Sequence, residues 1–216
     1  MFGVWRRLLA ALCGLLWLSA SSAASPDASS AGAVPGDAGR VARWAVESAD
    51  PRGRPFAVVD KKNASIHVFE ASGLLIGSAP VLLGLSAGDR DAVGSIGERS
   101  VGSLLPAERT TPAGRFETEP GHNDKGEAIV WFQYEAALAI HRLRPAPAYE
   151  RRPQRLASAD PAERRITFGC VVVPVDFYED VVAPTLGSRR GVVYVLPEEG
   201  SVDALLRDAE LALRAP

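Results

Sequence analysis

The stretch Arg165-Ile-Thr-Phe-Gly-Cys-Val-Val-Val-Pro174 decides how this 216-residue chain is organised. Its three valines form an apolar, β-branched run that predicts a buried strand, and the proline ends that strand. Gly169 has no Cβ, so a substrate backbone can approach the thiol and a positive φ is available. Asp176 and Glu179 have the spacing of a helix N-cap with its capping box. The stretch therefore predicts a thiol at the end of a strand, near the start of a helix.

Residues 1–24 predict an export signal. Two arginines precede an apolar run at 8–18, and the small residues that follow permit cleavage after Ala23 or Ala24. The run is too short to cross a bilayer comfortably. We therefore expect an exported protein of the periplasm or cell envelope, with no stable membrane insertion after signal removal.

Cys170 is expected to be the only cysteine of the exported chain, because Cys13 lies inside the apolar run and leaves with the signal. Structural cysteines of exported proteins come in pairs. A lone cysteine is therefore a reactive thiol, an intermolecular bridge or an inert buried side chain, and the residues alone leave these readings open.

Composition excludes several classes of function. The chain has 24 Lys and Arg against 26 Asp and Glu, and loss of the signal removes two of the arginines. Such a mildly acidic protein lacks the strongly basic face of a nucleic-acid binder. No Cys/His spacing typical of a zinc site occurs, so we expect no metal.

The chain divides into a tether, a body and a final helix. Residues 25–54 are expected to be a flexible tether that could include a short helix at 39–49, because small residues and prolines dominate it. Residues 55–197 form the body, and 198–216 a C-terminal helix with one apolar face. Strands are predicted at 56–60, 65–70, 74–84, 128–134, 138–141, 171–173 and 191–196, and residues 111–116 are predicted to be a turn that enters a strand. The predicted fold class is mainly β with a few helices (α+β), with long loops at 85–109 and 142–165.

Three histidines could act with Cys170. His67 lies in the middle of a predicted strand and His122 in a turn-forming run. His141 ends a strand and begins the loop that leads to the cysteine strand, so the two strand ends can face each other as a thiolate–imidazole pair. An imidazolium there would lower the thiol pKa. A purely structural His141 is the alternative.

Three segments, in this order, resemble the catalytic domain of the L,D-transpeptidases (the YkuD-type family): Thr111-Pro-Ala-Gly-Arg-Phe116, His141 and Thr167-Phe-Gly-Cys-Val171. The family typically shows Thr-Pro-x-Gly-x-Phe, a histidine, and Ser/Thr-x-Gly-Cys followed by an apolar residue. The early segments 58–62, 68–69 and 80–84 are also similar to the family's first strands. The resemblance covers about residues 55–196 and implies an L,D-transpeptidase-like β-sandwich or barrel with a short helix after the cysteine strand.

The resemblance implies a role for four residues. Cys170 would be the nucleophile and His141 the general base. The backbone carbonyl of Arg142 would orient the imidazole, and the amide of Cys170, with Gly169 shaping the approach, would stabilise the oxyanion. The family needs no cofactor.

The implied reaction is acyl transfer on peptidoglycan stem peptides. The thiolate attacks the carbonyl of the third residue, releases the terminal D-amino acid and holds a thioester. An amine then takes the acyl group and forms a crosslink, whereas water would give L,D-carboxypeptidase activity.

Two features depart from the family pattern. Val172 occupies a position that is usually Arg or Asn, and the histidine and cysteine are 29 positions apart, a longer spacing than is common. We expect the intervening loop, 142–165, to form a lid or recognition loop whose arginines either meet substrate carboxylates or remain solvated. Tyr149 in this loop and Thr167 are expected to contact the substrate.

Two other functions remain alternatives. A catalytically weak or inactive family member could serve as a cell-wall binding or scaffolding module, as Val172 suggests. A thiol redox protein would normally carry a second nearby cysteine, which this sequence lacks.

Overall fold

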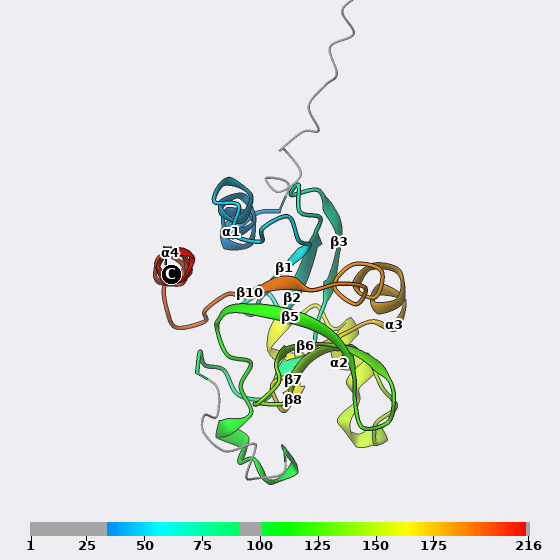
Figure 1. The fold of residues 1–216 in the computed structure, drawn as a ribbon. Coiled ribbons are helices and arrows are strands. Elements are labelled where there is room, and N and C mark those ends of the chain that lie inside the picture. Colours follow the sequence, from blue (N-terminus) through cyan, green and yellow to red (C-terminus); the bar gives the residue numbers. More distant parts are fainter. Residues whose placement is uncertain (1–33, 91–100, 215–216) are drawn as a thin grey trace, which may run out of the picture.

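The computed structural model describes residues 34–90 and 101–214 (Figure 1). The predicted export signal, and residues 91–100 of the first long loop, lie outside the described residues. Within the described ranges, no helix is both long and apolar enough to cross a membrane.

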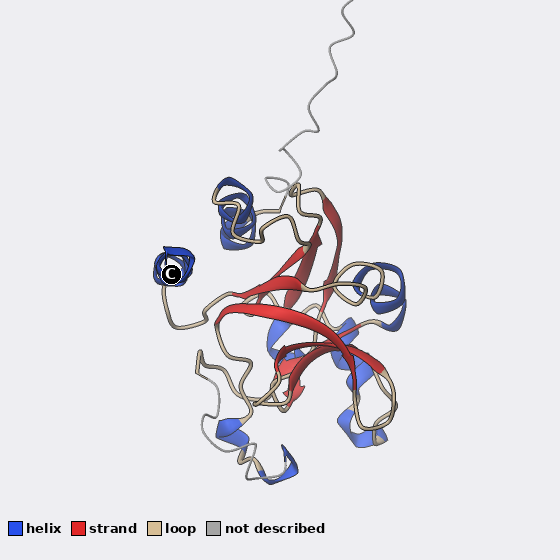
Figure 2. Ribbon diagram, in the orientation of Figure 1, coloured by secondary structure: helices blue, strands red, loops and turns tan. Residues whose placement is uncertain are grey.

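The prediction of a mainly β protein with a few helices is confirmed (Figure 2). The strands are β1 (Phe56–Asp60), β2 (Ser65–Phe69), β3 (Leu75–Pro80), β4 (Leu83–Gly84), β5 (Gly114–His122), β6 (Ala128–Gln133), β7 (Leu138–Arg142), β8 (Arg165–Thr167), β9 (Val171–Val173) and β10 (Gly191–Val195). The α-helices are α1 (Gly36–Glu47), α2 (Arg152–Ala157), α3 (Val175–Phe177), which continues as a π-helical turn to Val182, and α4 (Val202–Arg214).

Eight strands form one sheet in the order β3-β2-β1-β10-β5-β6-β7-β9, and β4 pairs with β8. The sheet is nearly closed into a barrel, because Leu82, just beyond β3, exchanges two backbone hydrogen bonds of 2.8 and 2.9 Å with Val172 of β9. The last strand of the sheet is therefore bonded to the segment that follows its first strand. Closure of this kind removes most of the open edge of the sheet.

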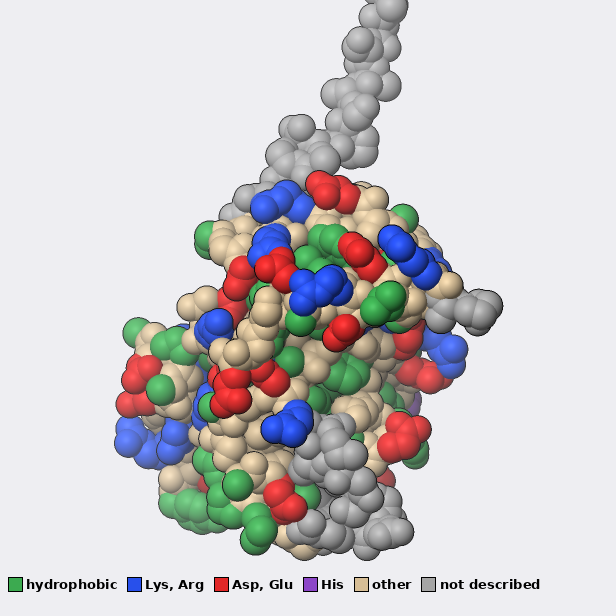
Figure 3. Space-filling model, turned by 90° about the vertical axis from the view of Figure 1, so that its left-hand side faces the viewer, with side chains coloured by type: hydrophobic (Ala, Val, Ile, Leu, Met, Phe, Trp, Pro, Cys, Tyr) green, Lys and Arg blue, Asp and Glu red, His purple; other side chains and the backbone are tan. Residues whose placement is uncertain are grey.

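Two hydrophobic layers follow from the alternation of side chains along the strands. The barrel interior is built from one face of β1, β2, β6, β7, β9 and β10. The other face of β1 and β10 packs against α1 and α4, which lie side by side at the left in Figure 1. The surface on that side of the molecule carries intermingled acidic and basic side chains (Figure 3).

Three local expectations differ from the structure. Helix α1 lies within the predicted tether, residues 25–54, but it packs onto the body through buried residues that include Ala38 and Val41. The predicted strand at 74–84 is divided into β3 and β4. The predicted N-cap at Asp176 is wrong: the helix already begins at Val175, so the carboxylate lies within the first turn and makes no capping hydrogen bond.

Candidate active site

Strands β7 and β9 bring the predicted nucleophile and base together. They run parallel, with Ile140 beside Val171 and His141 beside Val172. Extending this register by one position places Cys170 beside Ala139. The side chains of these strands that point into the barrel interior are Leu138, Ile140, Val171 and Val173. Because alternate residues face opposite sides, Cys170 and His141 share the outer face of the pair, on neighbouring strands.

His141 is held in one tautomer. Its side chain is buried, and Nδ1 lies 2.8 Å from the carbonyl oxygen of Arg142. Because a carbonyl can only accept, Nδ1 carries the proton and Nε2 keeps a free lone pair. Burial, helped by the charge of Arg144, lowers the pKa of His141 to about 4. The ring is therefore neutral at pH 7 and able to accept a proton.

The Cys170 thiol is half-buried and donates to the carbonyl of Ala137 at 3.6 Å. Burial raises the pKa of this thiol, against the smaller opposing effects of the Ala139 backbone and of the guanidinium groups of Arg144 and Arg152. Among the described residues, no hydrogen bond joins the sulfur to the imidazole of the neighbouring strand. The expected thiolate–imidazolium pair is thus not the resting state: desolvation favours a neutral thiol and a neutral ring.

Two threonines clamp the loop before Cys170. Thr167 donates to the Cys170 carbonyl at 2.7 Å and accepts from the Gly169 amide at 3.1 Å. Thr111 donates to the Gly169 carbonyl at 2.9 Å. Both hydroxyls are buried. The hydroxyl of Thr167 thus positions the cysteine loop, and the substrate contact that we expected of Thr167 stays a prediction.

Gly169 is required by the geometry of this loop. Its φ is +128°, in a region that side chains rarely adopt, and a Cβ would lie 2.6 Å from the carbonyl oxygen of Thr110. The glycine therefore lets the cysteine loop pass close to the neighbouring chain segment.

Lys61 supports the clamp from beneath, and sequence reasoning missed it. The side chain is fully buried, and Nζ donates to the Gly88 carbonyl at 2.6 Å, to Asp89 at 2.9 Å and to the Thr111 carbonyl at 2.9 Å. Arg165 completes the cluster by contacting the Glu198 carboxylate. The sequence feature that could have pointed to Lys61 is its place directly after the apolar strand β1, which is buried along its whole length.

The 142–165 insert covers the outer face beside the two candidate catalytic residues. Leu156 of α2 and Leu82 form a buried cluster with Val172, and Leu143 and Ile166 pack against it. Val172, the departure from the family pattern, is thus the residue on which the insert packs. Tyr149, also in the insert, is 82% exposed, and its expected substrate contact stays a prediction.

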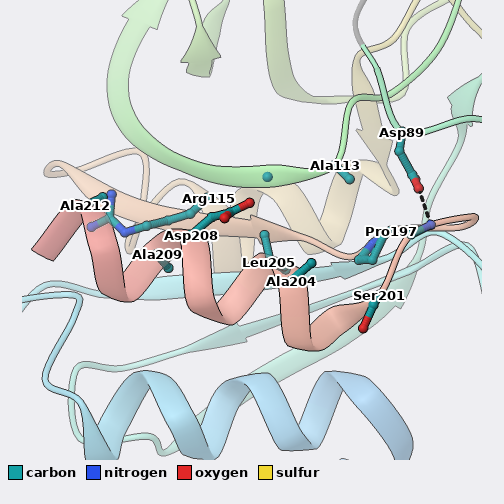
Figure 4. A pocket seen from close by; sticks show the side chains of 12 residues that line it. Asp89, Ala113, Arg115, Pro197, Ser201, Ala204, Leu205, Asp208, Ala209 and Ala212 are labelled. Carbon is teal, nitrogen blue, oxygen red and sulfur yellow. Dashed lines mark hydrogen bonds between the residues drawn. The ribbon is translucent and has the colours of Figure 1, made fainter.

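A separate groove lies between α4 and β5 (Figure 4). Its volume is about 340 Å³, and neither Cys170 nor His141 lines it. Asp89 stands at one end, where its carboxylate accepts from the amides of Glu198, Glu199 and Gly200. Among the described residues, no group of three His, Cys, Asp or Glu side chains is arranged to hold a metal ion.

Comparison with known proteins gives similarity to solved structures alone. No family model and no curated protein matches the chain. An L,D-transpeptidase from Mycobacterium smegmatis is 15% identical, with 66% of this chain and 58% of that one covered and a TM-score of 0.38. The catalytic domain of the E. faecium L,D-transpeptidase is 16% identical, with 67% and 98% covered and a TM-score of 0.39. The helical cell shape determining protein Pgp2 from Campylobacter jejuni is 14% identical, with 74% and 54% covered and a TM-score of 0.43.

The chain spans about half to three-fifths of the length of three of the L,D-transpeptidases that it matches. Similarity at this level concerns the general type of fold and is not evidence for an activity. Several of the solved structures that this chain resembles are L,D-transpeptidases of the YkuD type.

Proposed function

We propose that this protein is an exported, cysteine-dependent L,D-transpeptidase that acts on peptidoglycan stem peptides. One observation carries the proposal: Cys170 and His141 share a face of the paired strands β7 and β9, and the imidazole keeps a free Nε2 lone pair. The ordered motifs around Thr111, His141 and Cys170 give independent support from the sequence.

In the proposed first step, the Cys170 thiol gives its proton to Nε2 of His141 as the sulfur attacks the carbonyl carbon of the third stem residue. The carbonyl oxygen becomes an oxyanion, which the Cys170 amide stabilises. Collapse of this intermediate breaks the C–N bond. The departing D-amino acid takes the proton from the imidazolium, and a thioester remains on the sulfur.

In the second step, an amine of another stem attacks the thioester carbonyl and gives its proton to His141. The C–S bond then breaks, and the sulfur recovers the proton as a thiol. Water in place of the amine gives hydrolysis. The Arg142 carbonyl fixes the ring throughout, since it bonds to the nitrogen that does not exchange protons.

Turnover of purified muropeptides tests the proposal. Wild-type protein and Cys170→Ala are incubated with disaccharide tetrapeptides, and crosslinked products and free D-amino acid are separated by chromatography and weighed by mass spectrometry. We expect both products with wild type and neither with the variant. Products that persist in Cys170→Ala, or a folded wild type without turnover, would contradict the proposal, and the second result would favour the scaffolding alternative.

A further inference from the structure

The 142–165 insert is fixed over the site by packing. Leu143 and Leu156 pack with Val172, whose neighbour in the register is His141. The backbone amide of Leu143 also donates to Val173 at 2.8 Å. The residues that flank these two leucines are therefore held at defined positions on the face that carries the thiol and the imidazole.

Two arginines of this insert are oriented by carboxylates along one edge only. Nε of Arg144 lies 2.7 Å from Glu127, an ion contact outside the geometry of a hydrogen bond, and Nε of Arg152 contacts Glu150. In the part of the chain that the structure describes, the terminal nitrogens of these two guanidinium groups donate no hydrogen bond. Their side chains are 32% and 18% exposed, so a ligand can reach them.

Both guanidinium groups act electrostatically on both members of the candidate catalytic pair. Arg144 and Arg152 oppose the burial that raises the pKa of Cys170, and they add to the burial that lowers the pKa of His141. Such coupling falls off quickly with distance in a partly solvated site. The packing agrees with this: Leu143, the residue before Arg144, and Leu156, one helical turn after Arg152, both pack with Val172 beside His141. The two arginines are therefore carried on the segments that pack on the outer face of β7 and β9.

We propose that Arg144 and Arg152 form a carboxylate-binding pair beside Cys170, which selects acyl donors with a free carboxylate next to the bond that is cleaved. This inference rests on the proposed function, and it names the feature of the donor that the site recognises. A guanidinium fork binds a carboxylate through two parallel N–H donors. Each arginine is already pre-oriented through Nε, so little side-chain freedom is lost when the anion binds.

The first test does not depend on turnover. Alkylation rates of Cys170 are measured with iodoacetate, which is anionic, and with iodoacetamide, its neutral counterpart, at one pH. The ratio of the two rates cancels any change in the thiol pKa. We expect the double variant Arg144→Gln/Arg152→Gln to lower the ratio of iodoacetate to iodoacetamide rates by roughly fivefold or more. The matched control, Arg151→Gln, changes an exposed arginine of the same insert and is expected to leave the ratio unchanged.

The second test uses two stem tetrapeptides, one with a free C-terminal carboxylate and one with a C-terminal amide. Wild type is expected to prefer the acid in kcat/KM, and the double variant to lose that preference. An alkylation ratio unchanged in the double variant overturns the arginine pair even if wild type turns over. Wild type inactive on both peptides overturns the proposed function, while the alkylation ratio still decides the arginine pair separately.

Discussion

The cluster around Lys61 and the pair formed by Cys170 and His141 both lie at the cysteine loop. They differ in how many of their polar groups have hydrogen-bond partners. In the cluster around Lys61, the buried ammonium uses all three donors, on Gly88, Asp89 and Thr111. In the pair formed by Cys170 and His141, the thiol has one long contact of 3.6 Å and the imidazole bonds through one nitrogen. Each cluster includes a buried titratable group, Lys61 in the first and His141 in the second, yet only the second keeps unused bonding capacity.

The difference separates support from chemistry. A buried charge that satisfies every donor rigidifies its surroundings and has nothing left to offer a ligand. A half-buried thiol and an imidazole with a free lone pair can still form bonds to a substrate. The Lys61 ammonium reaches the cysteine loop through Thr111, so its effect on the reaction is one of position.

The largest expected effect comes from the imidazole. His141→Gln removes the proton acceptor, and we expect turnover of a stem tetrapeptide to fall by about 10²- to 10⁴-fold. His67→Gln is the matched control, because its ring bonds to Ser65 and Ser78 on β2 and β3. Release of D-amino acid is the measurement. Retention of more than a tenth of the activity in His141→Gln would show that this pair is not the reacting one.

Lys61→Met probes the satisfied cluster. Loss of the ammonium removes the counter-charge and one donor from the Asp89 carboxylate, and removes a donor from the Gly88 and Thr111 carbonyls. We expect the free energy of unfolding to fall by roughly 3–5 kcal/mol. Chemical denaturation measures the change. Lys62→Met, at an exposed neighbour, is expected to be close to neutral. Equal stability of the two variants would refute the supporting role.

The pH dependence of stability distinguishes the clusters. Because the folded pKa of His141 is about 4, below its ordinary 6.5, folded protein binds fewer protons than unfolded protein, and stability falls as pH drops from 6.5 to 4. The loss approaches roughly 3 kcal/mol. Burial alone would raise the pKa of Asp89, but the Glu198 amide and the Lys61 ammonium hold it at about 2, so its contribution is lost in a separate window, below pH 3.8.

Urea titrations of wild type and His141→Gln across this range isolate the contribution of the imidazole, because the variant lacks that ring. The charged neighbours that act on the ring in wild type, Arg144, Arg152 and Glu127, are present in both proteins. His67 also has a pKa lowered by burial, and it contributes equally to both proteins. The stability of wild type relative to His141→Gln should fall as the pH drops from 6.5 toward 4. Curves that stay parallel would contradict the neutral, buried ring.

Thr111→Val tests the link between the clusters. The substitution removes the hydroxyl that donates to Gly169 and accepts from the Gly84 amide, at a cost of about 1–3 kcal/mol of stability. We also expect kcat to fall by roughly tenfold, through misplacement of the thiol. Thr185→Val removes a comparable hydroxyl that bonds within the helical turn after α3, and should spare kcat.

Tyr149→Ala is expected to have the smallest effect. The side chain is exposed, so stability should change by less than about 0.5 kcal/mol. If the ring contacts substrate, KM rises while kcat stays constant. Steady-state kinetics with a stem tetrapeptide decides this, and an unchanged KM removes Tyr149 from the binding site.

Much of the fold follows from local patterns. Short apolar runs predict β1, β6 and β7 closely, and alternation predicts β2, because one face of each strand must enter the barrel interior. Closure through Leu82 and Val172 could not be predicted, since the pairing of segments distant in sequence leaves no local periodicity. The short helix α2 was missed for a related reason: one buried residue, Leu156, anchors it.

The candidate site divides in the same way. The motifs single out Cys170, His141 and Gly169, whose backbone and chemistry have local signatures. They do not reveal that Val172 serves as the packing surface for the insert, or that Lys61 reaches Thr111. Nor do they predict the neutral resting pair, because desolvation depends on everything that packs around the two groups.

Intact-protein mass spectrometry under single-turnover conditions tests the central claim most directly. Wild type mixed with a stem tetrapeptide should gain the mass of a tripeptidyl group, and peptide mapping should place this adduct on Cys170. Hydroxylamine should remove the adduct, as it does a thioester. In His141→Gln the adduct should form far more slowly. Absence of the adduct from folded wild type, its persistence in Cys170→Ala, or equal rates in the imidazole variant would contradict the account.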